Sequence, residues 1–411
     1  MLVHNKRKII NDPVHGFITI PSELIFDIIE HPYFQRLRHI KQLGLTYLVY
    51  PGAIHTRFQH AVGALHLMTQ AVEMLKVKGV VITDEEIQGL YLAILLHDAG
   101  HGPFSHALEH TLVEKVSHET LSLLFFQRLN SIFDGKLQLA TRIFSDDYPK
   151  KFLHQLVSGQ LDVDRLDYLM RDSFFTGVSE GVVSTDRIIK MLNVYNDELV
   201  VDVKGVYSIE NFIVARRLMY WQVYLHKTVL SAEHQLINIL NRAKYLCEKG
   251  GHLFTTPALE VFLKNRFTIE DFDNDPELLD KFAELDDHDV FLSVKMWSKS
   301  KDKVLALLSK KLIERKLLRI EISDTPFDQT YITNLRQKTQ KAFGIGEEES
   351  AYFVFSEEVA NNAYNPYFDI IHILYKDNRV LDITESSDQL NISLLSKTVR
   401  RYFLCYPKNL S

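Results

Sequence analysis

An apolar stretch at residues 90–96 ends in the ionisable pair His97-Asp98, and this junction constrains the fold more than any other feature of the sequence. Thr83, followed by two glutamates, is typical of a helix N-terminus, so we expect a helix that runs to residue 96. Because this helix is apolar on most sides, it belongs in the middle of a larger body. It therefore carries an imidazole and a carboxylate into the interior, where an unpaired carboxylate is costly. A bound cation would offset that cost.

Residues 22 to about 245 show a mostly helical pattern. Ser22 is a plausible N-cap for a helix over residues 23–30, and a second helix is expected over residues 34–43. Along residues 57–76, apolar side chains recur at helical spacing and His60 falls on the inward stripe. Gly63 in the same segment allows a neighbouring element to approach closely.

The pattern changes at residues 199–203 and 206–209, which flank Lys204-Gly205 as the strands of a β-hairpin would. Beyond about residue 260, charged helical segments precede β-rich stretches. These are residues 317–322, 351–355 and 368–383, the last with Asp377-Asn378 as its turn. We therefore predict a mainly α fold. A helical core over residues 1–260 would carry a small β-hairpin insertion and be followed by a smaller α+β region over residues 261–411.

Charge and cysteine content exclude several classes of protein. The 47 basic and 53 acidic residues give a net charge of −6, which does not favour binding to nucleic acid or to an anionic membrane. Cys247 and Cys405 form neither a disulfide framework nor a CxxC metal pair. The charged first ten residues do not resemble a signal peptide, and the longest apolar runs are about a third of a membrane span. A cytoplasmic protein without a membrane partner is expected.

Histidines gather around the His97-Asp98 pair. His97, His101, His106, His110 and His118 fall within 22 positions, although the whole chain has only 18 histidines. A single histidine in an apolar helix is more often a core residue with satisfied hydrogen bonds than a ligand. The adjacent aspartate and the density of histidines favour a metal or catalytic site here.

Residues 162–172 predict a helix that carries four carboxylates. The pairs Asp162–Arg165 and Asp167–Arg171, at i,i+3 and i,i+4, fit a solvated, ion-paired face. Asp164, Tyr168 and Asp172 recur every four residues and share another stripe. We expect this second stripe to form the wall of a site.

The order His60, His97-Asp98, Asp164 resembles the H…HD…D signature of HD-domain metal-dependent phosphohydrolases. Further motifs resemble their deoxynucleoside triphosphate triphosphohydrolase branch, which includes the sterile-alpha-motif-and-HD-domain enzyme. These motifs lie at residues 11–16, 34–38, 41–44, 51–53, 97–106 and 162–164. The resemblance spans about residues 8–230. It implies an HD-domain helical core, and no sterile-alpha-motif domain is expected before Lys8.

The resemblance implies that His60, His97, Asp98 and Asp164 hold a divalent metal ion. Two imidazoles and two carboxylates suit iron, manganese, zinc or nickel, and magnesium less well, so the sequence does not name the metal. Two open positions on the ion would take a phosphate oxygen and a water molecule. A dication can lower the pKa of that water from about 15.7 to about 7.

Further roles also come from the resemblance. The general acid would be His106, oriented by Glu109, with His118 and Glu119 as a second such pair. Contacts to the triphosphate would come from Arg57, His101, Arg165 and Arg216, although relatives commonly have Lys in place of Arg165. The residues packed around a deoxyribose, excluding a 2′-hydroxyl, would be Gln42, Leu43, Tyr168, Asp172 and Tyr224. Leu225 replaces a polar residue that contacts the base in a relative.

An allosteric nucleotide site is implied near the N-terminus. Lys8, Asn11, Gln35 and Arg38 match residues that hold an activator between subunits in a relative, whereas His31 replaces an aspartate that reads guanine there. The resemblance thus implies a homo-oligomer, a dimer or tetramer. For residues 261–411, which lie outside the resemblance, we expect a role in oligomerisation or regulation.

Three functions remain open from the sequence. The first is hydrolysis of dNTPs to deoxynucleoside and inorganic triphosphate by attack of water at the α-phosphorus. The second is a phosphatase or phosphodiesterase acting on another phosphorylated metabolite, because the ligand set alone does not distinguish these reactions. The third is a nucleic-acid-binding or sensor protein that retains the fold, against which the net charge of −6 argues.

Overall fold

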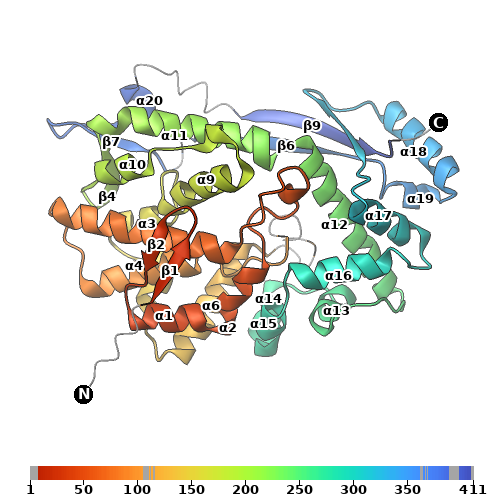
Figure 1. The fold of residues 1–411 in the computed structure, drawn as a ribbon, viewed down its shortest axis with the longest axis horizontal. Coiled ribbons are helices and arrows are strands. Elements are labelled where there is room, and N and C mark those ends of the chain that lie inside the picture. Colours follow the sequence, from red (N-terminus) through yellow and green to blue (C-terminus); the bar gives the residue numbers. More distant parts are fainter. Residues whose placement is uncertain are drawn as a thin grey trace.

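The computed structural model describes residues 8–104, 111, 113, 116–361, 364, 365, 367, 369–387 and 398–408. Most of this chain is helical, with short sheets at the N-terminus, at one side of the core and in the last third of the sequence (Figure 1). The mainly α prediction is confirmed.

The first part of the chain builds a helical body behind an N-terminal hairpin. Its strands are β1 (Ile9–Asp12) and β2 (Gly16–Thr19). Its helices are α1 (Glu23–Glu30), α2 (Pro32–Gln35), α3 (Arg57–Val77), α4 (Asp84–Leu96), α6 (His118–Ile132), α7 (Gln138–Phe144), α8 (Lys151–Val157), α9 (Val163–Thr176), α10 (Thr185–Met191), α11 (Val206–Met219) and α12 (Lys227–Glu248). Short turns of other helix types are η1 (Arg36–His39), η2 (Thr46–Leu48), η4 (Ser179–Gly181), η5 (Val203–Gly205) and the π-helical η6 (Tyr220–Tyr224).

The remaining chain adds further helices, of which α13 and α17 pack against α12, and strands that complete two sheets. The helices are α13 (Pro257–Lys264), α14 (Ile269–Asn274), α15 (Pro276–Ala283), α16 (Asp287–Trp297), α17 (Lys303–Ile313), α18 (Gln329–Phe343), α19 (Glu347–Ser350) and α20 (Ile383–Ser386). One sheet has the order β3-β4-β7-β8, formed by β3 (Leu192–Tyr195), β4 (Glu198–Asp202), β7 (His372–Leu374) and β8 (Val380–Asp382). Another has the order β5-β9-β6, formed by β5 (Arg319–Ser323), β6 (Phe355–Asn361) and β9 (Val399–Tyr406).

Helix starts are the sequence features that the structure follows most closely. The Ser22 hydroxyl accepts the Ile25 amide at 3.3 Å, and Thr83 forms a capping box with Glu86. The central helix α4 ends at Leu96, and His97 is its C-cap residue. Its apolar side chains belong to the buried core, as expected.

The expected helix over residues 34–43 is wrong beyond its first turns. After α2 and η1 the chain straightens, and the backbone amides of Gln42 and Arg57 donate to the carbonyls of His55 and Ile40 at 3.0 and 2.9 Å. Pairing with residues 55–57 therefore replaces the helical hydrogen bonds. This pairing brings Gln42 and Leu43 beside the start of α3.

The hairpin expected at residues 199–209 is wrong: a hairpin is present, but it lies one strand earlier in the chain, and Lys204-Gly205 belongs to η5 instead of a turn between strands. The strands are β3 and β4, and the turn is Asn196-Asp197, both with positive φ. Asparagine and aspartate tolerate that conformation best after glycine. Val206 instead begins α11, because Val206, Ile209, Phe212 and Ile213 bury one helical face.

The predictions for the C-terminal strands agree with the structure at two of three stretches. Residues 317–322 overlap β5, and residues 368–383 contain β7 and β8 with Asn378 at positive φ in their turn. The stretch 351–355 is mostly turn, and β6 starts at Phe355. The proposed division near residue 260 stays a prediction, although β4 and β7 pair in parallel across it.

A buried ion network fastens the hairpin β1–β2 and α9 to α3. Arg171 donates to Asp167 at 2.9 Å and to Asp12 at 2.7 Å, and His15 contacts Asp167 at 2.6 Å. The expectation of a solvated Asp167–Arg171 face is wrong, because both side chains are fully buried. A Cβ at Gly63 would lie 2.1 Å from the Arg171 guanidinium, so only glycine permits this approach.

We expect Arg171→Met to lower the free energy of unfolding by about 3–5 kcal/mol, because it leaves the carboxylates of Asp12 and Asp167 buried without their cation. Urea denaturation measures the change. The matched control is Arg128→Met, which removes a half-exposed pair with Asp280 and should cost about 0–1 kcal/mol. Equal losses in the two variants would contradict a structural role for the network.

Candidate metal centre and substrate cavity

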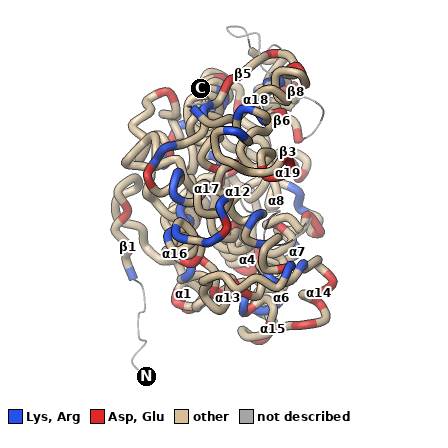
Figure 2. Tube along the Cα trace, turned by 90° about the vertical axis from the view of Figure 1, so that its right-hand side faces the viewer, with Lys and Arg blue, Asp and Glu red and all other residues tan. Residues whose placement is uncertain are grey.

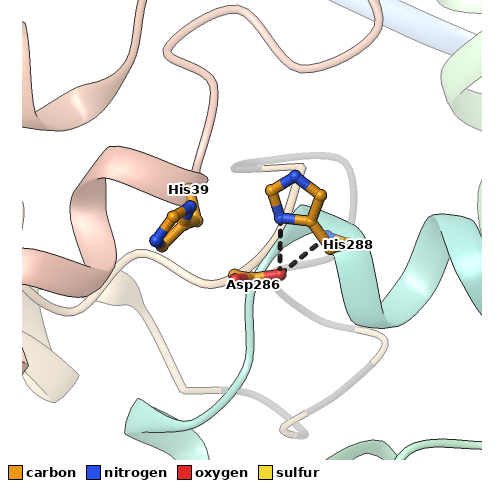
Figure 3. Close-up of side chains that lie close together, drawn as sticks. All are labelled: His39, Asp286 and His288. Carbon is orange, nitrogen blue, oxygen red and sulfur yellow. Dashed lines mark hydrogen bonds and ion pairs between the residues drawn. The ribbon is translucent and has the colours of Figure 1, made fainter.

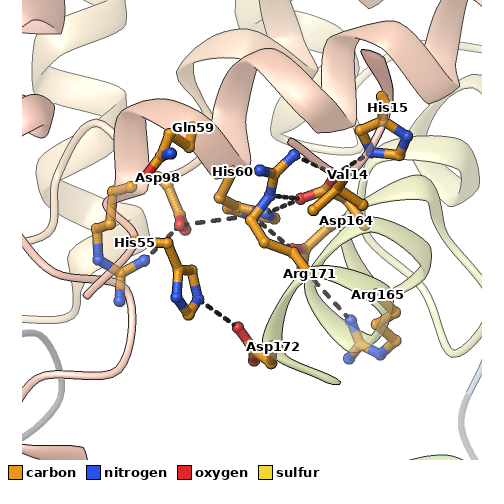
Figure 4. A network of polar contacts seen from close by, with 12 residues as sticks. Val14, His15, His55, Gln59, His60, Asp98, Asp164, Arg165, Arg171 and Asp172 are labelled. Carbon is orange, nitrogen blue, oxygen red and sulfur yellow. Dashed lines mark hydrogen bonds and ion pairs between the residues drawn. The ribbon is translucent and has the colours of Figure 1, made fainter. Parts of the chain in front are cut away.

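Three helices bring the predicted ligands together. His60 lies in the first turn of α3, His97 and Asp98 follow the last residue of α4, and Asp164 lies in the first turn of α9. Both α4 and α9 pack against α3. Figure 4 shows His60, Asp98 and Asp164 converging from these elements.

The spacing of the ligand atoms suits one cation. His60 Nε2 lies 3.0 Å from Asp164 Oδ1 and 3.3 Å from His97 Nε2, and His97 Nε2 lies 3.4 Å from Asp98 Oδ1. Adjacent ligands of an octahedral ion at about 2.1 Å would be separated by about 3.0 Å. His60, His97 and Asp164 therefore form a His/Asp cluster of a size that can hold a divalent metal ion, and Asp98 lies beside this cluster, where it groups with His101 and His118.

The far side of each imidazole is fixed by a hydrogen-bond partner. His60 Nδ1 lies 2.8 Å from Asp167 Oδ2, and His97 Nδ1 lies 2.6 Å from the Ile94 carbonyl. Both rings therefore direct Nε2 toward the shared centre. Such outer contacts set the tautomer and the basicity of metal-bound histidine.

The electrostatics of the centre favour a bound positive charge. Burial by itself would lower the pKa of His60, but hydrogen bonds to Asp164 and Asp167 raise this pKa to about 10. Burial by itself would raise the pKa of Asp98, but Arg57, His97 and His101 together hold this pKa well below its usual range. Arg57 forms an ion pair with Asp98. A metal ion in place of the proton on His60 Nε2 would face the same Asp164 carboxylate, while His60 Nδ1 keeps its contact with Asp167.

The centre opens into a cavity of about 520 Å³. The predicted wall of Asp164, Tyr168 and Asp172 lines it, as the spacing of these residues indicated. The predicted site residues among its lining are Gln42, Leu43, Arg57, His97, Asp98, His101, His118, Glu119, Asp164, Arg165, Tyr168, Asp172 and Tyr224. Residues far apart in the sequence thus share one space.

Two arginines next to this space have unused donors. The Nε atoms of Arg165 and Arg216 are buried without a hydrogen-bond partner among the described residues. Arg165 Nη1 contacts Asp162 at 2.8 Å, as the i,i+3 spacing predicted, but Asp162 is buried at the N-cap of α9. Arg216 lies over the Tyr220 ring at 6.0 Å, and it is absent from the described lining of the cavity. Unpaired guanidinium nitrogens are suited to phosphate oxygens.

At one end of the cavity, a short series of hydrogen bonds between polar side chains holds the lining residues in place. Tyr224 donates its hydroxyl to Asp172 Oδ2 at 2.7 Å, and His55 Nε2 lies 2.7 Å from Asp172 Oδ1. The His55 ring stacks on Phe175 at 4.5 Å. His55 was missed as a positioning residue, although it stands only two residues before Arg57. Both oxygens of Asp172 are therefore engaged, and the Tyr224 ring is fixed in place.

The predicted acid–base residues are described in part. His101 and His118 stack at a centroid distance of 3.8 Å, and His118 Nε2 lies 3.2 Å from Glu119. His101 also lies 3.3 Å from Asp98 Oδ1. His106 and Glu109 lie outside the described residues, as does His110.

Glu233 on α12 was not predicted from the sequence. It lines the same cavity, beside Leu225 and Leu230. Burial raises the pKa of its carboxyl group to about 8. Its Oε1 atom lies 3.8 Å from where a Cβ on Gly44 would be. No sequence pattern marked it, because Glu233 looks like an ordinary polar residue of a long helix.

The residues expected to bind an activator lie on the N-terminal surface. Lys8 lies over the Phe26 ring, and Gln35 bonds to Arg38 Nε at 2.8 Å. Asn11 is exposed on β1. His31 caps α2 through the Tyr33 amide. Their role stays a prediction.

Comparison with known proteins identifies the family to which the chain belongs. Residues 57–170 match the HD domain model and residues 183–243 match the HD associated region. The chain is 32% identical to the uncharacterized protein YwfO of Bacillus subtilis over 99% of its own length and 93% of that protein. The chain belongs to the HD-domain phosphohydrolase family.

Two further relatives refine this placement. A crystal structure of a phosphohydrolase from Bacteroides thetaiotaomicron matches with a TM-score of 0.94 and 54% identity, covering 98% of this chain and 100% of that one. A Dictyostelium discoideum homologue of the deoxynucleoside triphosphate triphosphohydrolase SAMHD1 is 33% identical over 57% of this chain and 49% of that protein. The chain thus spans about half of this SAMHD1 homologue. Among the described residues, no helix has the length and apolar character to cross a membrane.

We expect Asp164→Ala to bind one equivalent of divalent metal less than the wild type, because it removes the ligand that faces both His60 and His97. Metal content after dialysis and circular dichroism measure the loss and the retained fold. Asp186→Ala, at an exposed position of α10, serves as the control and should keep its metal. The same metal content in Asp164→Ala as in the wild type would refute the ligand assignment.

Proposed function

We propose that this HD-domain phosphohydrolase cleaves deoxynucleoside triphosphates to deoxynucleoside and inorganic triphosphate. The observation that carries the proposal is one cavity that joins the His/Asp centre to the guanidinium groups of Arg57 and Arg165 and to an ordered aromatic wall. Such a cavity suits a ligand with a polyphosphate at one end and a ring at the other. The similarity to SAMHD1 homologues supports a nucleotide substrate.

A divalent ion at the centre would supply Lewis acidity toward a phosphate oxygen and a water of lowered pKa. The chain's own groups do the rest. Arg57, Arg165 and Arg216 would bind the triphosphate oxygens, and the fixed backs of His60 and His97 keep the ligands aligned. The new bond joins the water oxygen to the α-phosphorus, and the bond from phosphorus to the 5′-oxygen breaks.

The departing 5′-oxygen needs a proton. His106 with Glu109, or His118 with Glu119, would donate it. His118 stacks on His101 beside the centre and lines the cavity, so it would share that space with the scissile ester of a bound substrate. Proton donation of this kind contributes about 10²–10⁴ in rate.

Sugar selection would come from the aromatic wall. Tyr224 is held by Asp172, and its ring lies 6.2 Å from that of Tyr168. A fixed ring pressed against the sugar leaves no space for a 2′-hydroxyl. Exclusion by shape discriminates well when the wall cannot move away.

The other two functions are less well supported. A phosphatase or phosphodiesterase would use the same metal ligands, but would not need the aromatic wall. A nucleic-acid-binding role would favour an extended basic surface. In Figure 2, Lys and Arg are interspersed with Asp and Glu along the described chain, in agreement with the net charge of −6.

Product analysis tests the reaction directly. We expect metal-loaded protein to convert dNTPs to deoxynucleoside and triphosphate, with ¹⁸O from labelled water appearing in the triphosphate, because attack occurs at the α-phosphorus. Anion-exchange chromatography and mass spectrometry identify the products. Asp164→Ala is the control for contaminating activity. Release of orthophosphate or pyrophosphate would contradict this mechanism, and no turnover of any dNTP would contradict the proposed function.

We expect Tyr224→Ala to reduce the preference for dNTP over rNTP by at least about tenfold, because it removes the ring that excludes the 2′-hydroxyl. The ratio of kcat/KM values for matched nucleotides measures this preference. Tyr224→Phe keeps the ring and loses only the bond to Asp172, so it should retain most of the preference. An unchanged ratio in Tyr224→Ala would remove Tyr224 from sugar selection.

We expect Glu233 to influence base selection. With a pKa of about 8 its carboxyl group is mostly neutral at pH 7 and offers one donor and one acceptor. That pattern pairs with adenine or cytosine, which present an amino group beside a ring nitrogen. Glu233→Leu should shift the relative kcat/KM among the four dNTPs by about tenfold, whereas Glu233→Gln should shift it less. Identical selectivity in the wild type and Glu233→Leu would contradict this role.

A further inference from the structure

A second group of metal-ligand side chains lies on the surface, away from the HD centre. His39 is the last residue of η1, Asp286 is the N-cap of α16, and His288 lies in the first turn of α16. Figure 3 shows the two rings on either side of the Asp286 carboxylate. One ligand atom from each residue lies within 4.8 Å of the others.

The three side chains already face one another. His288 Nδ1 lies 3.2 Å from Asp286 Oδ1, and the rings of His39 and His288 are 5.5 Å apart. The same carboxylate oxygen accepts the backbone amide of His288 at 2.7 Å, which fixes its position. A carboxylate has about four acceptor directions, so capping the helix leaves it able to bind an ion.

We propose that His39, Asp286 and His288 form a second metal site, for a borderline divalent ion such as Zn²⁺. Two imidazoles and one carboxylate are a donor set that zinc uses, whereas Mg²⁺ prefers oxygen ligands alone. The ligand atoms around a tetrahedral ion lie about 2.1 Å from the ion and therefore about 3.4 Å from one another. Side-chain rotations that move the ligand atoms by about an ångström would complete the site. His39 and His288 are exposed, which leaves this rotation free.

The ion would connect two elements that both hold the segment after His97-Asp98. Arg36, one turn before His39, donates to the His101 carbonyl at 2.8 Å. Asp287, between the two α16 ligands, accepts the backbone amides of Phe104 at 2.8 Å and Lys41 at 3.0 Å. Fastening η1 to α16 therefore restrains both ends of residues 101–104. The second site would regulate the centre by stabilising this segment.

Zinc titration of the full-length chain tests the site without reference to activity. We expect wild-type protein to bind one more equivalent of Zn²⁺ than His39→Ala/His288→Ala by isothermal titration calorimetry and by metal analysis after dialysis. The control is His252→Ala, which removes an exposed histidine outside the cluster and should keep that equivalent. Equal zinc content in wild type and the double variant would overturn the proposal.

Hydrogen exchange tests the connection to the centre. Added Zn²⁺ should slow amide exchange of Phe104 and Lys41 at least about threefold in wild-type protein and not in His39→Ala/His288→Ala. Both proteins keep the HD centre, so zinc bound there affects them alike. Slowed exchange confined to the wild type supports the coupling. Equal exchange in the two proteins would show that the surface ion does not act on the segment.

Discussion

The centre depends on the Asp167 carboxylate, which meets His60, His15 and Arg171 in a fully buried position. One carboxylate thereby orients a metal ligand, anchors the N-terminal hairpin and pairs with the guanidinium that also reaches Asp12. The charge of Arg171 and these hydrogen bonds keep the pKa of Asp167 well below its usual range despite burial. Because the group stays ionised, it can hold the His60 ring in the tautomer that directs Nε2 inward. Ligand geometry and fold stability therefore share one interaction.

The residues around the rest of the cavity are held in the same way, by hydrogen bonds from one buried side chain to another residue. Asp172 holds both Tyr224 and His55, Arg36 holds the carbonyl of His101, and Asp287 holds the amide of Phe104. Two of these residues, Arg36 and Asp287, come from segments more than 200 residues apart in the sequence. The region beyond residue 260 thus reaches the centre through α16. A site built on such supports needs little reorganisation when substrate binds.

Much of the site followed from the sequence because its residues are tied to local signals. The capping residues Ser22 and Thr83 marked helix starts, and the four-residue spacing of Asp164, Tyr168 and Asp172 gave the cavity wall. The burial of Asp167–Arg171 was not predictable, since an i,i+4 ion pair has the same pattern on a solvated face and in a core. Nor was the contribution of Glu233, because its environment is set by Leu230, Leu225 and the distant Gly44. Local patterns specify elements, whereas long-range packing decides which face is buried.

The parallel pairing of β4 with β7 joins the two halves of the chain, since Val200 aligns with His372. During synthesis on the ribosome, β4 emerges long before its partner strand and waits with one edge uncovered. An unpaired edge can join a strand from another molecule. Nascent chains stalled between these two strands therefore expose a strand edge that the folded protein covers.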